Sequence, residues 1–281
     1  MISTEVLKLA LMALTFQETP CIKSPHTLPK SQTVVCQGMP ITISAPNECP
    51  QDGCGMIIDA HGGYMNQVSQ NQNTGFSILG PANGYITVQP SAPGRNWTDE
   101  NYVKLITFFF EALEKWPLHK GKVHVTGFSL GGYLSWWFGC HLGDHVASIA
   151  PLSSGVKRVC TNPDQPVPQL PVLFMHGWKD SIISYAEAME SRDLMNKHHG
   201  MEQTKAHQGV GYRHYRFENP EGLLMELYTH DFETSAAYGH GHCFPNPIIW
   251  PTPFSCVGRL PLSWGLLVMD FFKRTAKTQG H

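Results

Sequence analysis

The stretch Lys122-Val123-His124-Val125-Thr126-Gly127-Phe128-Ser129-Leu130-Gly131-Gly132 decides the fold of this chain. An apolar run typical of a strand ends at Thr126, a Gly-x-Ser-x-Gly turn follows, and a helical pattern begins directly after it. Glycines are needed at 127 and 131 because a sharp strand-to-helix turn leaves no room for side chains there. The turn also places the Ser129 hydroxyl at a helix N-terminus, where an oxyanion is favoured. We therefore predict that Ser129 is a nucleophile; a capping serine in an ordinary turn is the alternative.

The remaining chain alternates strand and helix patterns. Buried strands are predicted at Met39–Ile43, Met56–Ala60, Tyr85–Val88, Lys122–Thr126, Val146–Ala150 and Val172–Met175. Helices are predicted at Glu100–Trp116, Leu130–His141, Ser184–His199 and Pro261–Lys277. A hairpin near the sheet edge is predicted from Tyr212–Phe217 and Leu223–Thr229. This alternation predicts an α/β fold with a mostly parallel sheet and helices on both faces.

Length and charge limit the domain count and the kind of partner. The 281 residues suffice for one sizeable core, so we predict a single catalytic domain over residues 31–281 after an N-terminal segment over 1–30. The chain carries 20 basic and 22 acidic residues, a formal charge of -2, so no field favours a polyanion. We therefore expect no nucleic acid as a partner.

The N-terminal segment contains an apolar run within Met1–Phe16. The run is shorter than the roughly 20 residues that cross a bilayer, so we expect no membrane anchor. Lys8 precedes it and polar residues follow, as in a signal peptide, but Glu5 is out of place and no clear cleavage site follows. The remnant of a signal and an ordinary N-terminal helix both stay open.

Eight cysteines are an even number, which fits an oxidising compartment; free buried thiols are the alternative. We predict a disulfide between Cys243 and Cys256, because it would brace the loop before the last helix. Nearness in sequence suggests the other pairs, which are Cys21–Cys36, Cys49–Cys54 and Cys140–Cys160.

A serine nucleophile needs a histidine to accept its proton and a carboxylate to orient that histidine. Asp180 is the preferred acid because it follows the buried strand Val172–Met175; Asp164 and Asp231 are reserves, and a turn aspartate that caps the next helix is the alternative. The base should follow the acid in the chain, and His240 and His242 stand out in a glycine-rich loop.

Two backbone N–H groups should form an oxyanion hole. Leu130 follows the nucleophile and is expected to supply one of them. The other should come from the loop after the strand Met56–Ala60, where spacing leaves Gly63 and Tyr64 both open. We expect no metal, because no carboxylate–histidine set at zinc spacing accompanies the two loop histidines, and no cofactor.

Four motifs together resemble the extracellular polyhydroxybutyrate depolymerase and feruloyl esterase-like family of α/β hydrolases, from about Ile41 to Arg274. They are Asp59-Ala60-His61-Gly62-Gly63, Val125-Thr126-Gly127-Phe128-Ser129-Leu130-Gly131-Gly132, His176-Gly177-Trp178-Lys179-Asp180 and Gly241-His242-Cys243-Phe244-Pro245. In that family the elbow serine, the aspartate of an H-G-x-x-D segment and the histidine of a G-H-x-W-P segment form a triad. The resemblance therefore implies Ser129, Asp180 and His242 as the triad, and it chooses His242 over His240.

The resemblance further implies a secreted serine ester hydrolase, extracellular or periplasmic, that acts through an acyl-enzyme on hydroxyalkanoate, feruloyl or related esters, including polyesters. It also implies that Trp97 lies near the substrate. Trp178 and Phe244 depart from the family's small residue and tryptophan. Trp97, Trp178, Tyr64 and Phe244 would suit an apolar or aromatic acyl group; core packing is the alternative for each.

Two other functions compete with this interpretation. A peptidase of the same fold is disfavoured because the chain offers no separate lid or propeller domain. A non-catalytic binding protein of the same fold is disfavoured because all three triad positions are filled. We therefore expect an ester substrate as the partner, and a monomer.

Overall fold

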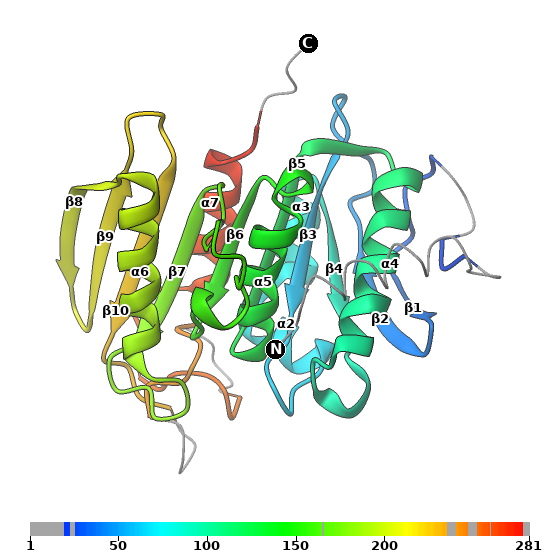
Figure 1. The fold of residues 1–281 in the computed structure, drawn as a ribbon. Coiled ribbons are helices and arrows are strands. Elements are labelled where there is room, and N and C mark those ends of the chain that lie inside the picture. Colours follow the sequence, from blue (N-terminus) through cyan, green and yellow to red (C-terminus); the bar gives the residue numbers. More distant parts are fainter. Residues whose placement is uncertain are drawn as a thin grey trace.

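The computed structural model describes residues 20–22, 26–164, 166–234, 240–246, 252–258 and 260–277. The apolar run at Met1–Phe16 lies outside these residues. Within them, ten strands form one sheet in the order β1-β2-β4-β3-β5-β6-β7-β10-β9-β8 (Figure 1). The strands are β1 (Gln32–Cys36), β2 (Met39–Ser44), β3 (Cys54–Ala60), β4 (Tyr85–Pro90), β5 (Leu118–Phe128), β6 (Ser148–Leu152), β7 (Val172–Gly177), β8 (Glu202–Gly209), β9 (Tyr212–Glu218) and β10 (Leu224–His230).

The centre of the sheet is parallel. Strands β4, β3, β5, β6, β7 and β10 all pair in parallel register. The antiparallel pair β1 and β2 extends the sheet beyond β4, and β9 and β8 extend it beyond β10. The predicted mostly parallel sheet is thereby confirmed, and the predicted hairpin corresponds to β9 and β10.

Helices cover both faces of the sheet. They are α2 (Gln67–Thr74), α3 (Phe76–Ala82), α4 (Asp99–Lys115), α5 (Leu130–His141), α6 (Tyr185–His199) and α7 (Trp264–Arg274), with short 3-10 turns η1 (Pro93–Arg95), η2 (Gly143–His145) and η3 (Val156–Arg158). Helices α4, α5 and α6 lie on one face, and α3 and α7 lie on the other (Figure 1). The structure thus agrees with the predicted layers, and it adds β1, β8, α2 and α3, which the sequence patterns did not predict.

The central strands are mainly apolar because both of their faces are buried. In β3, Met56 and Ile58 pack into the layer that contains Trp136 of α5, whereas Ile57 packs into the layer that contains Trp264 of α7. Successive side chains of a strand point to opposite faces, so one continuous apolar run supplies two cores.

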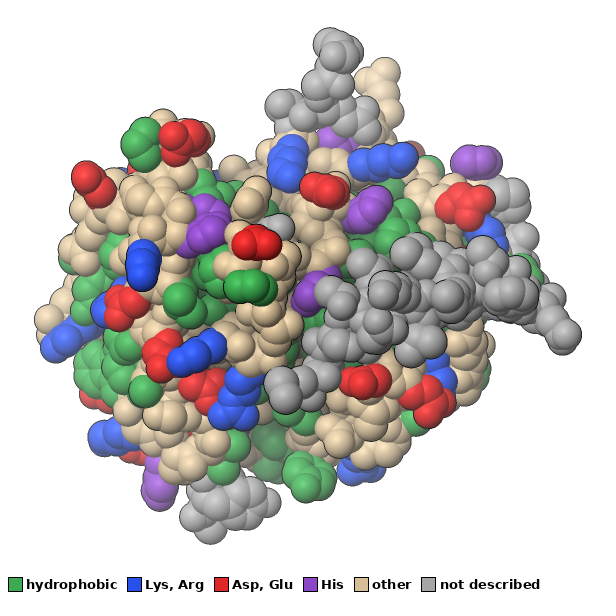
Figure 2. Space-filling model, in the orientation of Figure 1, with side chains coloured by type: hydrophobic (Ala, Val, Ile, Leu, Met, Phe, Trp, Pro, Cys, Tyr) green, Lys and Arg blue, Asp and Glu red, His purple; other side chains and the backbone are tan. Residues whose placement is uncertain are grey.

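Four disulfides brace the fold, and they join the predicted pairs. They are Cys21–Cys36, Cys49–Cys54, Cys140–Cys160 and Cys243–Cys256. Among the described residues, no helix has the length and apolar character that a membrane span requires. Acidic and basic side chains are interspersed over the face drawn in Figure 2.

Candidate active site

The turn between β5 and α5 holds Ser129 in a strained conformation. Its backbone angle φ is 55°, a value that residues other than glycine rarely adopt. A Cβ on Gly127 would overlap the carbonyl of Gly131, and one on Gly131 would overlap the carbonyl of Ala60. The two glycines are therefore required by the space around this turn, as the sequence predicted.

Asp180 and His242 are brought together at the carboxyl ends of the central strands. The Nδ1 atom of His242 lies 2.7 Å from Oδ2 of Asp180. The other carboxylate oxygen accepts hydrogen bonds from the backbone N–H groups of Ile182 and Ile183, at 2.9 and 2.8 Å. Because an ionised carboxylate only accepts, Nδ1 of His242 carries the proton of this bond, and Nε2 is left to accept another.

A second imidazole, which we had not predicted, contacts the same carboxylate. Nε2 of the fully buried His176 lies 3.3 Å from Oδ2 of Asp180 and donates to the Ile183 carbonyl at 2.8 Å. Burial alone would raise the pKa of Asp180, but the bonds from His176 and His242 outweigh it and hold the pKa of this carboxyl well below its ordinary value. Asp180 is thus an anion over the whole neutral range.

The other candidates lie elsewhere. His240 is exposed and pairs with Glu233 through Nδ1 at 3.2 Å. The reserve acids Asp164 and Asp231 are exposed, and neither forms an ion pair with a described histidine. The structure therefore joins Asp180 to His242, and not to His240.

Two glycines explain how the loop of His242 docks on the loop of Asp180. A Cβ on Gly177 would overlap the Gly241 carbonyl, and one on Gly241 would lie 2.7 Å from the backbone nitrogen of Asp180. Gly241 also has a φ of 71°. The disulfide from Cys243 anchors the residue that follows His242.

Ser129 and His242 line one cavity of about 490 Å³. The cavity also contains both predicted loops of the oxyanion hole, and most of the rest of its wall is apolar. The described residues around it are Gly63, Tyr64, Phe128, Ser129, Leu130, Tyr133, Arg158, Ile182, Ile183, Thr234, His242, Pro253 and Phe254.

The loop after β3 distinguishes the two oxyanion candidates. The Tyr64 N–H already donates to the Arg95 carbonyl at 3.0 Å, whereas the Gly63 N–H bonds to no described residue. Buried His61 fixes this loop: its Nε2 accepts from the backbone N–H of Ala92 at 3.0 Å. Burial lowers the pKa of His61 to about 4, so the ring stays neutral.

Three predicted substrate residues do not belong to the described lining of the cavity. Trp97 is buried, and its indole N–H donates to the His61 carbonyl at 2.8 Å. Phe244 is fully buried against Phe128, with ring centroids 4.4 Å apart. The ring of Trp178 lies 4.9 Å from the Arg213 guanidinium. Of the predicted aromatic residues, Tyr64 does line the cavity.

Tyr133 and Arg158 line the cavity and had not been predicted. The Tyr133 hydroxyl donates to Glu187 at 2.6 Å, and Arg158 forms an ion pair with the same carboxylate. These residues come from α5, η3 and α6, and no motif links them in the sequence. Only the fold brings them together.

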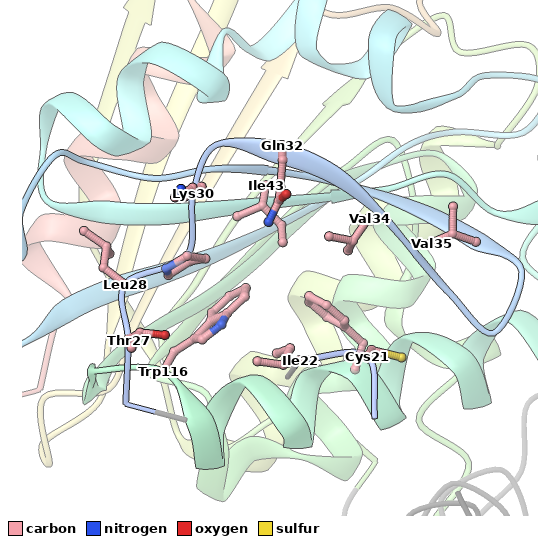
Figure 3. Close-up of a pocket in the computed structure, with 12 residues that line it drawn as sticks. Cys21, Ile22, Thr27, Leu28, Lys30, Gln32, Val34, Val35, Ile43 and Trp116 are labelled. Atoms are coloured by element: carbon pink, nitrogen blue, oxygen red, sulfur yellow. The ribbon is translucent and has the colours of Figure 1, made fainter. Parts of the chain in front are cut away.

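A second cavity, of about 530 Å³, lies beside β1, β2 and α4 (Figure 3). Ile22, Leu28, Val34 and Trp116 contribute to its largely apolar wall. Its described lining contains no histidine or acidic side chain. The described residues also contain no group of three or more His, Cys, Asp or Glu side chains placed to hold a metal.

Comparison with solved structures identifies the fold of this chain. An acetyl xylan esterase from Aspergillus awamori superimposes with a TM-score of 0.61 and 15% identity, over 86% of this chain and 98% of that one. The chain has the α/β-hydrolase fold. Est1E from Butyrivibrio proteoclasticus gives a TM-score of 0.45 and 14% identity, over 59% of this chain and 84% of that one.

In sequence, the chain is 21% identical over 155 residues to a bifunctional acetylxylan esterase/xylanase of Neocallimastix patriciarum. The match covers 53% of this chain but 22% of that relative, so the chain spans about a fifth of its length. No family model matches the sequence. The predicted likeness to polyhydroxybutyrate depolymerases therefore stays a prediction.

Proposed function

We propose that this chain is a serine ester hydrolase that acts through an acyl-enzyme, with residues 31–281 as its catalytic domain. One observation carries the proposal. Ser129 sits in a strained turn that no side chain at 127 or 131 would permit, and it shares a cavity with His242, which is hydrogen-bonded to Asp180. This is the arrangement that activates a serine hydroxyl.

In the proposed reaction, His242 accepts the Ser129 proton as the hydroxyl oxygen attacks the ester carbonyl. The tetrahedral intermediate collapses, the bond to the alcohol breaks, and His242 returns the proton to the leaving alcohol. Water then attacks the acyl-enzyme in the same way and releases the acid and free Ser129. Asp180 holds the imidazole and stabilises its charged form.

The oxyanion of each tetrahedral intermediate would be held by the backbone N–H groups of Leu130 and Gly63. Leu130 opens α5, where the first N–H groups of a helix have no partner within the helix. We choose Gly63 over Tyr64 because the Tyr64 N–H is already used by Arg95. The N-terminus of α5 adds a favourable dipole.

A fluorophosphonate probe tests this function directly. We expect covalent labelling of the wild-type chain at the peptide that contains Ser129, and no labelling of the Ser129→Ala or His242→Ala variants when they are folded. A folded wild-type protein that neither reacts nor cleaves a p-nitrophenyl ester would refute the proposal in favour of a binding protein.

We further propose that the part of the substrate in contact with the cavity wall is mainly apolar or aromatic, because Phe128, Ile182, Ile183 and Phe254 form much of that wall. Hydroxyalkanoate and feruloyl esters, including polyesters, fit this description, and the relatives named above add acetylated xylan. Hydrolysis of hydroxybutyrate oligomers, methyl ferulate, acetylated xylan and an aromatic polyester, compared side by side, would identify the class. The four disulfides support a secreted enzyme.

A further inference from the structure

The candidate active-site cavity has one fixed cation in its wall. Of the described residues that line it, Arg158 alone is a lysine, arginine, aspartate or glutamate. Most of the surrounding wall is apolar, whereas the Arg158 side chain is 64% exposed, so solvent reaches its guanidinium group. An anionic group of a substrate would therefore find one attractive position at this side of the cavity.

The Arg158 side chain is held in place by Glu187 and Tyr133. Its Nη2 atom pairs with Glu187, and its guanidinium carbon lies 5.4 Å from the centroid of the Tyr133 ring. The Tyr133 hydroxyl donates to the other oxygen of Glu187 at 2.6 Å. Both Arg158 and Tyr133 line the cavity, whereas Glu187 does not. The cation is thus positioned before any substrate arrives.

Glu187 uses only part of the guanidinium. The Nε and Nη1 atoms of Arg158 form no hydrogen bond with any described residue. An arginine fork can bind a carboxylate through two parallel hydrogen bonds, and these bonds are stronger than one to a neutral hydroxyl. Arg158 therefore has both the free donors and the charge that a carboxylate requires.

We propose that Arg158 binds a carboxylate carried by the ester substrate, so that the enzyme prefers esters with a free acid group to neutral esters of the same length. The inference rests on the proposed function. The carboxylate can belong to the acid part of the ester, as in monomethyl adipate, or to the alcohol part, as in ω-acetoxyhexanoate. Methyl hexanoate and hexyl acetate are the matched neutral esters.

The test measures kcat/KM for these four esters in a pH-stat. We expect one of the two charged esters to exceed its neutral partner by about fivefold, the upper range for an exposed ion pair, because the Arg158 side chain is 64% exposed and already pairs with Glu187. Which pair shows the preference tells which part of the substrate lies at Arg158. The preference should shrink as salt is added.

Two variants separate a binding role from a general effect of charge. Arg158→Gln should abolish the ratio between the charged and neutral esters. Lys157→Gln removes the neighbouring cation, which pairs with Glu190 at 3.5 Å and is not part of the cavity lining, and should leave the ratio within twofold. If neither charged ester is preferred over its neutral partner, or if both variants change the ratio equally, this inference fails and the hydrolase proposal stands. If no ester is cleaved and Ser129 is not labelled, both fail.

Discussion

Asp180 stabilises both the loop that contains it and the candidate base. One of its oxygens accepts two backbone N–H groups from its own loop, and the other faces the imidazoles of His242 and His176. The carboxylate therefore fixes both the loop and the candidate base. An amide at this position would replace an acceptor by a donor, and either the loop or an imidazole would lose its partner.

The two loop histidines give the sharpest test at the level of residues. His242→Ala and Ser129→Ala should each lower kcat by about ten-thousandfold or more, and the double variant should lose little beyond either one, because such residues act as a unit. His240→Ala is the matched control: its exposed ring pairs with Glu233, so kcat should stay within about threefold. Steady-state kinetics on a p-nitrophenyl ester with folded proteins decide the matter. Loss of activity in His240→Ala, with His242→Ala active, would move the base by two residues.

Sequence motifs could identify the residues whose chemistry depends on their immediate neighbours. Ser129 is recognised from the glycines beside it, and Gly63 and Tyr64 from the loop that contains them. The choice between those two donors depends on the hydrogen bond from Tyr64 to the Arg95 carbonyl, about 30 residues away. Arg158 had no such signal, because its partners lie on two other elements. Residues that act through distant contacts require the fold.

The loop that carries His242 depends on the elements around it more than on its own backbone. A disulfide joins Cys243 to Cys256, and the backbone of Phe244 pairs with that of Phe254 at 2.8 Å. Helix α2 adds a polar contact, since Asn73 accepts from Ser255 at 2.8 Å. The candidate base is thus held by a covalent bond and two neighbouring segments.

Breaking that disulfide should affect both stability and chemistry. The Cys243→Ser, Cys256→Ser double variant should lose about 3 kcal/mol of unfolding free energy, as expected for a loop of this length. It should also lose turnover, because His242 is adjacent to the bond. Urea unfolding and ester kinetics, both at a temperature where the variant is folded, provide the two measurements.

The disulfide Cys49–Cys54 provides the matched control. It closes a short loop at the start of β3, the strand end remote from Ser129, so its removal should cost about 2 kcal/mol and leave kcat nearly unchanged. Equal losses of turnover in the two double variants would contradict a special role for the bond beside His242.

Helix α2 and strand β8 show why some elements could not be predicted. The buried face of α2 is polar, because Gln70 and Thr74 donate to the buried carboxylate of Asp59 at 2.6 and 2.7 Å. Strand β8 is exposed along nearly its whole length. Apolar periodicity detects elements that bury apolar surface, so neither gave a signal, whereas the apolar central strands did.

At the scale of the whole molecule, the sheet buries several ionisable groups. His61, His124 and His230 have no exposed surface, and they lie on three separate strands or strand ends. Burial lowers the pKa of His61 to about 4 and those of His124 and His230 to about 3. Burial raises the pKa of Asp59 to about 6, against the bonds from its amide and hydroxyl partners.

These shifts make the stability of the protein depend on pH. Between about pH 6.5 and 4, the unfolded chain protonates the three histidines and the folded chain does not, so the free energy of unfolding falls as the pH falls. Asp59 acts in the opposite direction, because the folded state takes up its proton near pH 6 and the unfolded state near 3.8. At pH 5 the unfolded chain binds about three more protons than the folded chain at the histidines and about one fewer at Asp59. The net difference of about two protons gives the free energy of unfolding a slope of about 3 kcal/mol per pH unit. Partly buried His141 and His199, whose pKa values are also lowered, steepen the fall.

Urea unfolding at several pH values between 4.5 and 7 should reveal this slope. This is about the pH range in which an unperturbed histidine titrates. His124→Phe should keep the stacking on Phe272, whose ring centroid is 4.4 Å away, and reduce the slope at pH 5 by about one proton. Gln208→Phe is the control: this side chain on β8 is exposed and carries no ionisable group, so the slope should not change. A free energy of unfolding that is flat from pH 6.5 to 5 would mean that the three buried rings titrate as they do in the unfolded chain, and that water reaches them.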